Sequence, residues 1–135
     1  MSHTDSVHPL TDAFWEGARG GRLMIPHCNE CRQWYWPVRY RCARCGGELA
    51  WKAATGRGVL LSWTIILRAP RPQLQSLVPY VVAFVRLEEG VTLMTRLKDT
   101  SGQGLAVNTR VECSFEAAPG ESGADRLPVF SIVEG

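Results

Sequence analysis

The stretch C-N-E-C at residues 28–31, followed after ten residues by C-A-R-C-G-G at residues 42–47, decides how the first part of this 135-residue chain folds. Each C-x-x-C turn presents two sulfur atoms to one point, and the residues between the turns can form a hairpin that brings the turns together. We therefore predict a tetrahedral site for one zinc ion, within a ribbon that spans residues 22–52. Its expected ligands are Cys28, Cys31, Cys42 and Cys45.

The expected metal centre is a closed one. Four sulfur ligands leave no open coordination position, so we expect a structural zinc ion and not a catalytic one. The same ligands can hold a single iron ion, as in a rubredoxin-type electron carrier, and this alternative stays open. His27 adjoins Cys28, but four sulfurs already complete the shell, so we interpret it as an ordinary ribbon histidine.

The composition favours an intracellular protein with reduced cysteines. The first nine residues lack the basic start and apolar stretch of a secretory signal, and no apolar run approaches the roughly 20 residues needed to cross a bilayer. Four of the five cysteines lie in C-x-x-C pairs. In a chain that lacks a secretory signal, this spacing indicates metal binding and not disulfides. We expect a cytoplasmic protein that does not contact a membrane.

The charge distribution argues against a general polyanion binder. Residues 1–70 contain nine Lys/Arg and five Asp/Glu, whereas residues 71–135 contain six and eight. Four thiolates and one zinc ion would bring the formal net charge from +2 to about zero.

One short helix is predicted at residues 9–19, before the cysteines. Thr11 is the expected N-cap, and Gly20-Gly21 is the expected stop. A helix of about three turns is marginal alone in water, so the adjacent Phe14 and Trp15 are expected to dock onto another surface. Two surfaces are equally open at this point: the protein's own ribbon or barrel, and a partner subunit.

After the cysteines the apolar pattern changes to a period of two, which is typical of strands. The first strand is expected at residues 58–67, with one face made by Val59, Leu61, Trp63, Ile65 and Leu67. Further strands are expected at residues 80–88, 91–98, 111–115 and 129–133, with a hairpin turn at Glu89-Gly90. Five strands fit a small closed barrel over residues 53–135, after an N-terminal segment at residues 1–21, so the chain is expected to be mainly β.

Two long connections interrupt the strands. Residues 68–79 contain three prolines, which exclude a central strand, and their apolar Leu74, Leu77 and Val78 favour a functional loop. Residues 117–128 are rich in Gly, Ala, Ser and acidic residues, which indicates a solvated loop.

The sequence offers no catalytic constellation. All three histidines lie in the first 27 residues, and the fifth cysteine, Cys113, alternates with Val111 and Phe115 as a core thiol would. We therefore expect no catalytic residues in this chain. Four arginines surround the expected metal site, where they either neutralise its negative charge or bind a phosphorylated ligand. They are Arg32, Arg39, Arg41 and Arg44.

Several stretches, in a fixed order over roughly residues 14–132, are similar to the DUF35 family. They are F-W-E-G at residues 14–17, G-R-L at 21–23, Trp36-Pro37 and Arg39 between the cysteine pairs, G-R-G-V at 56–59, and the run over residues 79–97. The resemblance implies a helix, a rubredoxin-like zinc ribbon and a five-stranded OB-fold. Its zinc ligands map onto the four cysteines, and it brings no catalytic residues.

The resemblance also implies a function. Family members associate with acyl-CoA enzymes, so this chain would be a non-catalytic accessory subunit in a hetero-oligomer with a thiolase-like subunit. Activity would belong to the complex, and this chain would help to complete its CoA or acyl-CoA site. Candidate contacts to CoA phosphates are Arg39, Arg41 and Arg68, because guanidinium groups suit phosphate geometry. Phe14 and Trp15 are candidate contacts to the partner.

The alternative is a protein that binds single-stranded nucleic acid, because zinc ribbons and OB-folds both do so with stacking aromatics in a basic groove. Here the barrel half is acidic, and the positions of Trp63 and Phe115 favour core packing. Tyr80, Phe84 and Phe130 are open to either use. We therefore expect no nucleic-acid partner.

Overall fold

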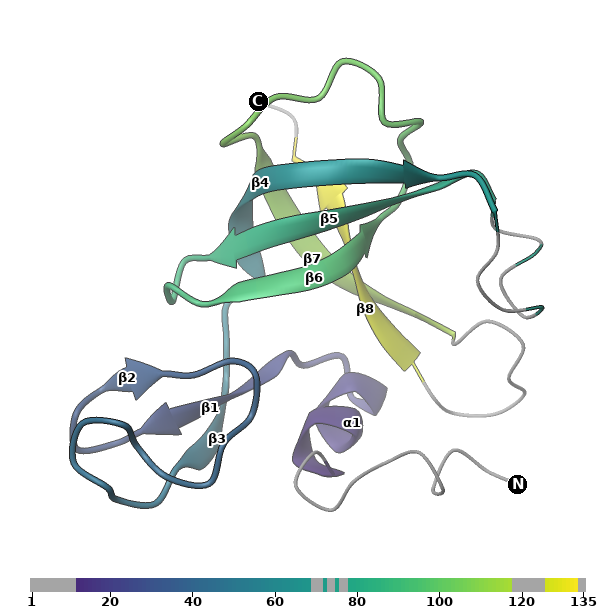
Figure 1. Cartoon of the computed structure of the whole chain (residues 1–135). Coiled ribbons are helices and arrows are strands. Elements are labelled where there is room, and N and C mark those ends of the chain that lie inside the picture. Colours follow the sequence, from purple (N-terminus) through teal and green to yellow (C-terminus); the bar gives the residue numbers. More distant parts are fainter. Residues whose placement is uncertain (1–11, 69–71, 73–74, 76–77, 118–125, 134–135) are drawn as a thin grey trace.

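The computed structural model describes residues 12–68, 72, 75, 78–117 and 126–133, which form a helix, a small ribbon sheet and a barrel (Figure 1). The elements are α1 (Asp12–Arg19), β1 (Met24–Cys28), β2 (Gln33–Trp34), β3 (Ala50–Ala53), β4 (Arg57–Ile66), β5 (Tyr80–Leu87), β6 (Thr92–Leu97), β7 (Arg110–Ala117) and β8 (Arg126–Ile132). The expected chain of mainly β structure, with one short N-terminal helix, is confirmed.

Helix α1 ends where its glycines predict. Gly21 has a φ of 77°, the Arg22 N–H donates to the Gly17 carbonyl at 2.8 Å, and the Gly21 N–H donates to the Ala18 carbonyl at 3.1 Å. This pair of bonds is a Schellman motif, which favours glycine at its left-handed position. The expected N-cap, Thr11, lies outside the described residues. No helix in the described part of the chain is long and apolar enough to span a membrane.

Helix α1 packs within the chain. The Phe14 ring lies 5.2 Å from the Trp36 ring of the ribbon and also packs against the main apolar core. The Trp15 ring stands edge-on against Phe14 at 5.2 Å. The helix contacts β1 and β3 on one side and β8 on the other, so it bridges the ribbon and the barrel (Figure 1). Intramolecular docking therefore accounts for Phe14.

Two sheets follow the helix. The ribbon sheet has the order β2-β1-β3 with antiparallel pairing. The barrel closes in the order β4-β5-β6-β8-β7, in which β6 and β8 run parallel and all other neighbours are antiparallel. This is the five-stranded OB-fold order, and it confirms the expected fold.

Strand β4 differs from the expected alternation. A β-bulge shifts its register against β5 between Leu60 and Ser62. Because the extra residue reverses which side chains point inward, Leu60 is fully buried before the bulge, and Trp63 and Ile65 pack against the core after it. The prediction of one continuous inward face was therefore wrong, and its last member, Leu67, is 74% exposed.

One apolar core joins the ribbon to the barrel. Leu23 and Ile25 of the ribbon belong to the same buried cluster as Leu60 and Phe130 of the barrel. Cys113 packs against this cluster, as expected of a core thiol, and burial followed by the nearby Glu112 charge raises its pKa to about 12.

The segment between ribbon and barrel is held against the β5–β6 turn. The Thr55 N–H donates to the Glu89 carboxylate at 2.8 Å, and the Thr55 hydroxyl donates to Glu88 at 3.1 Å. Arg57 pairs with Glu88 at 3.2 Å, and its guanidinium group lowers the pKa of that carboxyl. Exposed contacts of this kind are individually weak, but together they set the point at which the ribbon leaves the barrel.

Candidate metal centre

The four cysteines of the C-x-x-C turns come together at the tip of the ribbon. Their sulfur atoms all lie within 4.8 Å of one another, and the Cys28 and Cys45 sulfurs are 3.7 Å apart. A tetrahedral zinc ion with zinc–sulfur bonds of about 2.3 Å separates its sulfurs by about 3.8 Å. None of the cysteines forms a disulfide. The donor set and its spacing therefore fit zinc.

Backbone N–H groups of both turns point at these sulfurs. The Cys31 N–H lies 3.4 Å from the Cys28 sulfur, and the Arg44 N–H lies 3.3 Å from the Cys42 sulfur. In the second turn, the Gly47 N–H also donates to the Cys45 sulfur at 3.3 Å. Hydrogen bonds to a charged sulfur favour the thiolate form that binds a metal ion.

Tyr35 supports the site from the opposite side of the hairpin. Its hydroxyl donates to the Cys42 sulfur at 3.2 Å and accepts a hydrogen bond from the Ala43 N–H at 3.1 Å. This hydroxyl is the main reason why the pKa of Cys42 falls to about 6. By contrast, a hydrogen bond with Cys45 is the main reason why the pKa of Cys31 rises to about 12. Zinc binding must therefore displace protons, and its affinity will fall with falling pH.

We expect Tyr35→Phe to weaken zinc binding by about 10- to 100-fold, because groups that orient metal ligands typically have effects of this size. Competition with a chromophoric chelator measures this affinity. Tyr40→Phe is the matched control, since Tyr40 lies in the same hairpin and is 70% exposed. Equal zinc affinity in the two variants would contradict a supporting role for the Tyr35 hydroxyl.

His27 and the nearby arginines have partners within the ribbon. His27 is buried, its Nδ1 lies 3.0 Å from the Asn29 side-chain oxygen, and its ring packs against Trp34, which agrees with a structural histidine. Arg39 donates to the Arg41 carbonyl at 2.8 Å, and Arg41 donates to the Gly46 carbonyl at 3.5 Å. Both guanidinium groups therefore help to hold the hairpin that carries the second turn.

The three arginines proposed for CoA phosphates do not form one cluster. Arg39 and Arg41 lie on the ribbon, whereas Arg68 follows the end of β4 and is exposed. Strand β4 starts beside the ribbon and runs away from it over ten residues (Figure 1), which corresponds to roughly 30 Å. A single phosphate-bearing group near the metal site would not reach all three.

Most of the aromatic side chains of the barrel pack in or against its apolar core. Trp63 and Phe115 pack against the buried cluster, as their alternation predicts, and Phe130 is fully buried within it. Tyr80 is half-buried, and Phe84 is exposed. The described barrel surface thus lacks the row of exposed aromatics on which single-stranded bases stack.

A four-cysteine ribbon that precedes a closed five-stranded barrel defines the class of zinc-ribbon and OB-fold proteins. Sequence comparison agrees. Residues 15–50 match the family described as "ChsH2, rubredoxin-like zinc ribbon domain", and residues 51–116 match "ChsH2, C-terminal OB-fold domain". The chain belongs to the DUF35 family.

Individual relatives show how far the similarity extends. A DUF35 domain-containing scaffold protein of Methanothermobacter thermautotrophicus is 30% identical over 100 residues, which cover 73% of this chain and 74% of that protein. A probable enoyl-CoA hydratase alpha subunit of Thermomonospora curvata is 33% identical over 122 residues, which cover 88% of this chain. The chain spans only 36% of the length of that second relative.

A solved structure is also similar. A chain of the Ltp2-ChsH2(DUF35) aldolase superposes with a TM-score of 0.83 at 27% identity, covering 94% of this chain and 97% of that one. The similarity therefore includes the helix, the ribbon and the barrel.

Sequence reasoning missed Tyr35 as a supporting group of the metal site. Its hydroxyl reaches Cys42 because β2 and the second turn face each other across the hairpin. A tyrosine four residues after Cys31 is a weak signal on its own, since an exposed tyrosine, Tyr40, lies in the same hairpin.

Proposed function

We propose that this chain is a non-catalytic, zinc-binding accessory subunit of a thiolase-type complex, in which it helps to complete the site for CoA or acyl-CoA. The observation that supports this most is the near-complete superposition on a chain of the Ltp2-ChsH2(DUF35) aldolase. Relatives described as scaffold proteins and as a subunit of a probable enoyl-CoA hydratase point in the same direction.

In this proposal the zinc ion is structural. Helix α1 of the N-terminal segment (residues 1–21), the zinc-held ribbon (residues 22–52) and the barrel (residues 53–135) would dock together beside the acyl-CoA site. Four sulfurs close the coordination shell, so the metal ion activates no water. Cys113 is a poor nucleophile at neutral pH because its pKa is about 12. The nucleophilic chemistry would belong to the partner, and the reducing cytoplasm would keep the zinc-binding cysteines as thiols.

Co-expression tests the partnership directly. The tagged full-length chain would be produced with the thiolase-like subunit encoded nearest to it, and the zinc-loaded material would be analysed by size-exclusion chromatography with light scattering. We expect one species that contains both subunits. A chain that stays monomeric beside that subunit, and instead binds single-stranded nucleic acid in a salt-dependent manner, would favour the alternative function.

An exposed apolar pair on the barrel is our candidate for the partner contact. Phe84 on β5 and Met94 on β6 are direct cross-strand neighbours, and they are 46% and 67% exposed. Adjacent apolar side chains that remain exposed on a strand face are typical of interfaces. Phe14 and Trp15 are weaker candidates, because they pack against each other and Phe14 also contacts Trp36.

We expect the double variant F84S/M94S to weaken association with the thiolase-like subunit by about 30-fold, which corresponds to about 2 kcal/mol for an interface hot spot. Surface plasmon resonance with the purified subunit measures the change. Leu67→Ser is the matched control, since Leu67 is a 74% exposed apolar residue outside this pair. If the double variant bound the thiolase-like subunit with unchanged affinity, this face of the barrel would not be part of the interface.

A further inference from the structure

The four sulfur ligands of the metal centre are unequally protected from solvent. Cys28 and Cys42 are 1% and 3% exposed, and the Tyr35 hydroxyl lies 3.2 Å from the Cys42 sulfur. Cys31 is half-buried, and Cys45 is exposed. Each C-x-x-C turn therefore contributes one buried ligand and one ligand that solvent can reach.

The two glycines after Cys45 leave its sulfur open on one side. Gly46 has a φ of 74°, a left-handed conformation that favours glycine. Gly47 does not adopt that conformation, so this reason for glycine does not apply to it. A Cβ atom at Gly47 would lie 3.2 Å from the Cys45 sulfur. The absence of a side chain at this position therefore keeps the sulfur accessible.

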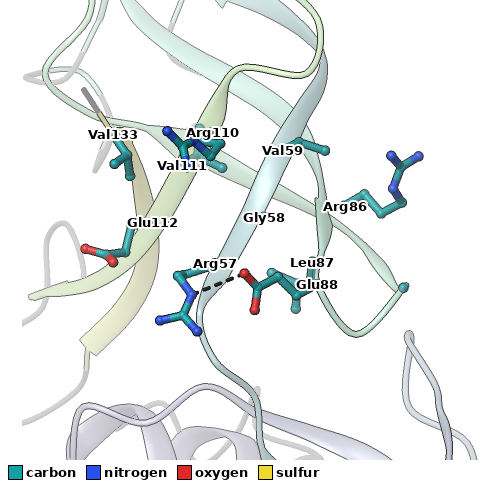
Figure 2. Close-up of a pocket in the computed structure, with 11 residues that line it drawn as sticks. Arg57, Gly58, Val59, Arg86, Leu87, Glu88, Arg110, Val111, Glu112 and Val133 are labelled. Atoms are coloured by element: carbon teal, nitrogen blue, oxygen red, sulfur yellow. Dashed lines mark hydrogen bonds and ion pairs between the residues drawn. The ribbon is translucent and has the colours of Figure 1, made fainter. Parts of the chain in front are cut away.

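Reactive thiolates in the described part of the chain are confined to the metal centre. Cys113 packs against the apolar core, and burial raises its pKa to about 12, so it is a protonated thiol at neutral pH. The described residues that line the barrel cleft across β4, β5 and β7 include no cysteine (Figure 2). A cysteine that coordinates a metal ion is held as the thiolate, which is the nucleophilic form. The accessible thiolates of the zinc-loaded chain are thus Cys31 and Cys45.

We propose that Cys31 and Cys45 are an oxidation-sensitive half of the metal centre, at which hydrogen peroxide converts two zinc ligands into a disulfide. The Cys45 thiolate would attack one peroxide oxygen, which forms a sulfenic acid and releases hydroxide. The Cys31 thiolate would then attack the Cys45 sulfur and release a second hydroxide. The two thiolates together lose two electrons, and the broken O–O bond of the peroxide accepts them.

The geometry of the site allows this pairing. All four sulfurs lie within 4.8 Å of one another, so the Cys31 and Cys45 sulfurs need to approach by less than about 3 Å to form a bond of about 2 Å. The Cys28 sulfur is 3.7 Å from the Cys45 sulfur, but Cys28 is buried and held in strand β1 opposite Gln33. Cys31 lies in the turn between β1 and β2 and is the freer partner.

The disulfide would cost the ribbon its metal ion. Cys28 and Cys42 alone supply two sulfurs, which do not complete the four-coordinate shell of zinc. A ribbon of this size depends on metal binding for its stability, so it would loosen when the zinc ion leaves. This chemistry belongs to the chain alone and goes beyond the proposed function. Only its consequence for the complex, loss of ribbon docking under oxidants, rests on that function.

Zinc release from the zinc-loaded full-length chain tests the proposal, with hydrogen peroxide as the oxidant and a chromophoric chelator as the zinc indicator. We expect release of the zinc ion together with a Cys31–Cys45 disulfide, and recovery of the other three cysteines as thiols. A thiol reductant with added zinc should restore the metal-bound form.

Mass spectrometry of tryptic peptides would identify the disulfide. Cleavage after Arg41 and Arg44 separates Cys42 from Cys45, whereas Cys28 and Cys31 stay in one peptide. Fragmentation spectra of that peptide are therefore needed to show which of its two cysteines is bonded.

Cys45→His tests the exposed ligand, because three cysteines and one histidine also bind zinc. It should keep zinc, and its peroxide-dependent release should be about tenfold slower than in the wild type. Gly47→Ala should slow release by a smaller factor, since it covers the Cys45 sulfur without removing it. Cys113→Ser is the matched control and should react at the wild-type rate. Each rate is corrected for release without peroxide, so that a change in zinc affinity is not mistaken for oxidation.

Three results would overturn the proposal. These are retention of zinc in excess peroxide, a disulfide between any other pair of cysteines, and equal peroxide-dependent rates in the wild type and Cys45→His. If Cys45→His does not bind zinc, the disulfide found in the wild type decides alone. Association with the thiolase-like subunit is measured separately on the reduced, zinc-loaded chain, so this inference and the proposed function can fail independently.

Discussion

Removing the zinc ion, or replacing the buried ligand Cys42 with serine, is expected to unfold the ribbon. Structural zinc binding in small ribbons is worth about 10–16 kcal/mol, whereas whole domains are stable by only about 5–15 kcal/mol. The ribbon sheet contains only three short strands, so it cannot compensate for such a loss. The damage should spread to the barrel, because Leu23 and Ile25 of the ribbon belong to the shared core.

A chelator titration followed by tryptophan fluorescence and circular dichroism would measure this unfolding. Trp34 and Trp36 report on the ribbon, since one packs against His27 and the other against Phe14. Cys113→Ser is the matched control, because Cys113 lies in the barrel outside the group of four sulfurs. It should retain zinc and keep the ribbon signal.

Two results would contradict this account of the metal. A ribbon that keeps its fluorescence and its melting temperature in excess chelator would not depend on a metal ion. Visible iron–thiolate absorption in the purified protein would show that the bound metal is iron and not zinc. That result would favour the electron-carrier interpretation.

Gly58→Ala is expected to destabilise the barrel by about 3 kcal/mol, the upper part of the usual range for overpacking. A Cβ atom at Gly58 would lie 2.4 Å from the Arg86 carbonyl oxygen and 3.0 Å from a Val85 methyl group. The oxygen belongs to the backbone of the adjacent strand, so it cannot move without disturbing the β4–β5 pairing. The melting temperature should fall by roughly 10 °C.

Thermal unfolding of the zinc-loaded protein would test this, with Gly20→Ala as the control. A Cβ atom at Gly20 would meet neighbours only at 3.6 Å and beyond, which is ordinary van der Waals contact. If the Gly58→Ala protein had the same melting temperature as the Gly20→Ala control, strands β4 and β5 would be able to separate at little cost.

The metal site could be predicted because its four ligands lie close together in the sequence. Two C-x-x-C turns each bring a pair of sulfurs together through a few backbone bonds, and the hairpin between them is too short to allow many other arrangements. The alternation of apolar residues likewise predicted the five barrel strands and the hairpin at Glu89-Gly90, because the period of two follows from strand geometry itself.

The bulge in β4 shows where such reasoning fails. Val59, Leu61, Trp63 and Ile65 alternate without interruption in the sequence, yet the extra residue between Leu60 and Ser62 moves the inward side from one set to the other. The bulge accommodates the curvature of the closed barrel, and no residue near Leu61 indicates in the sequence that a bulge will form there.

The sequence by itself determined the zinc-ribbon chemistry, the number of barrel strands and the DUF35 family, since each depends on residues that are close together or on a local repeat. Only the tertiary structure decided which distant side chains meet. It set Tyr35 against Cys42, and Phe14 against Trp36. It also set Arg86 and Arg110 on either side of Val59. The physical reason is that strand register and barrel closure, which depend on the whole core, determine these neighbours.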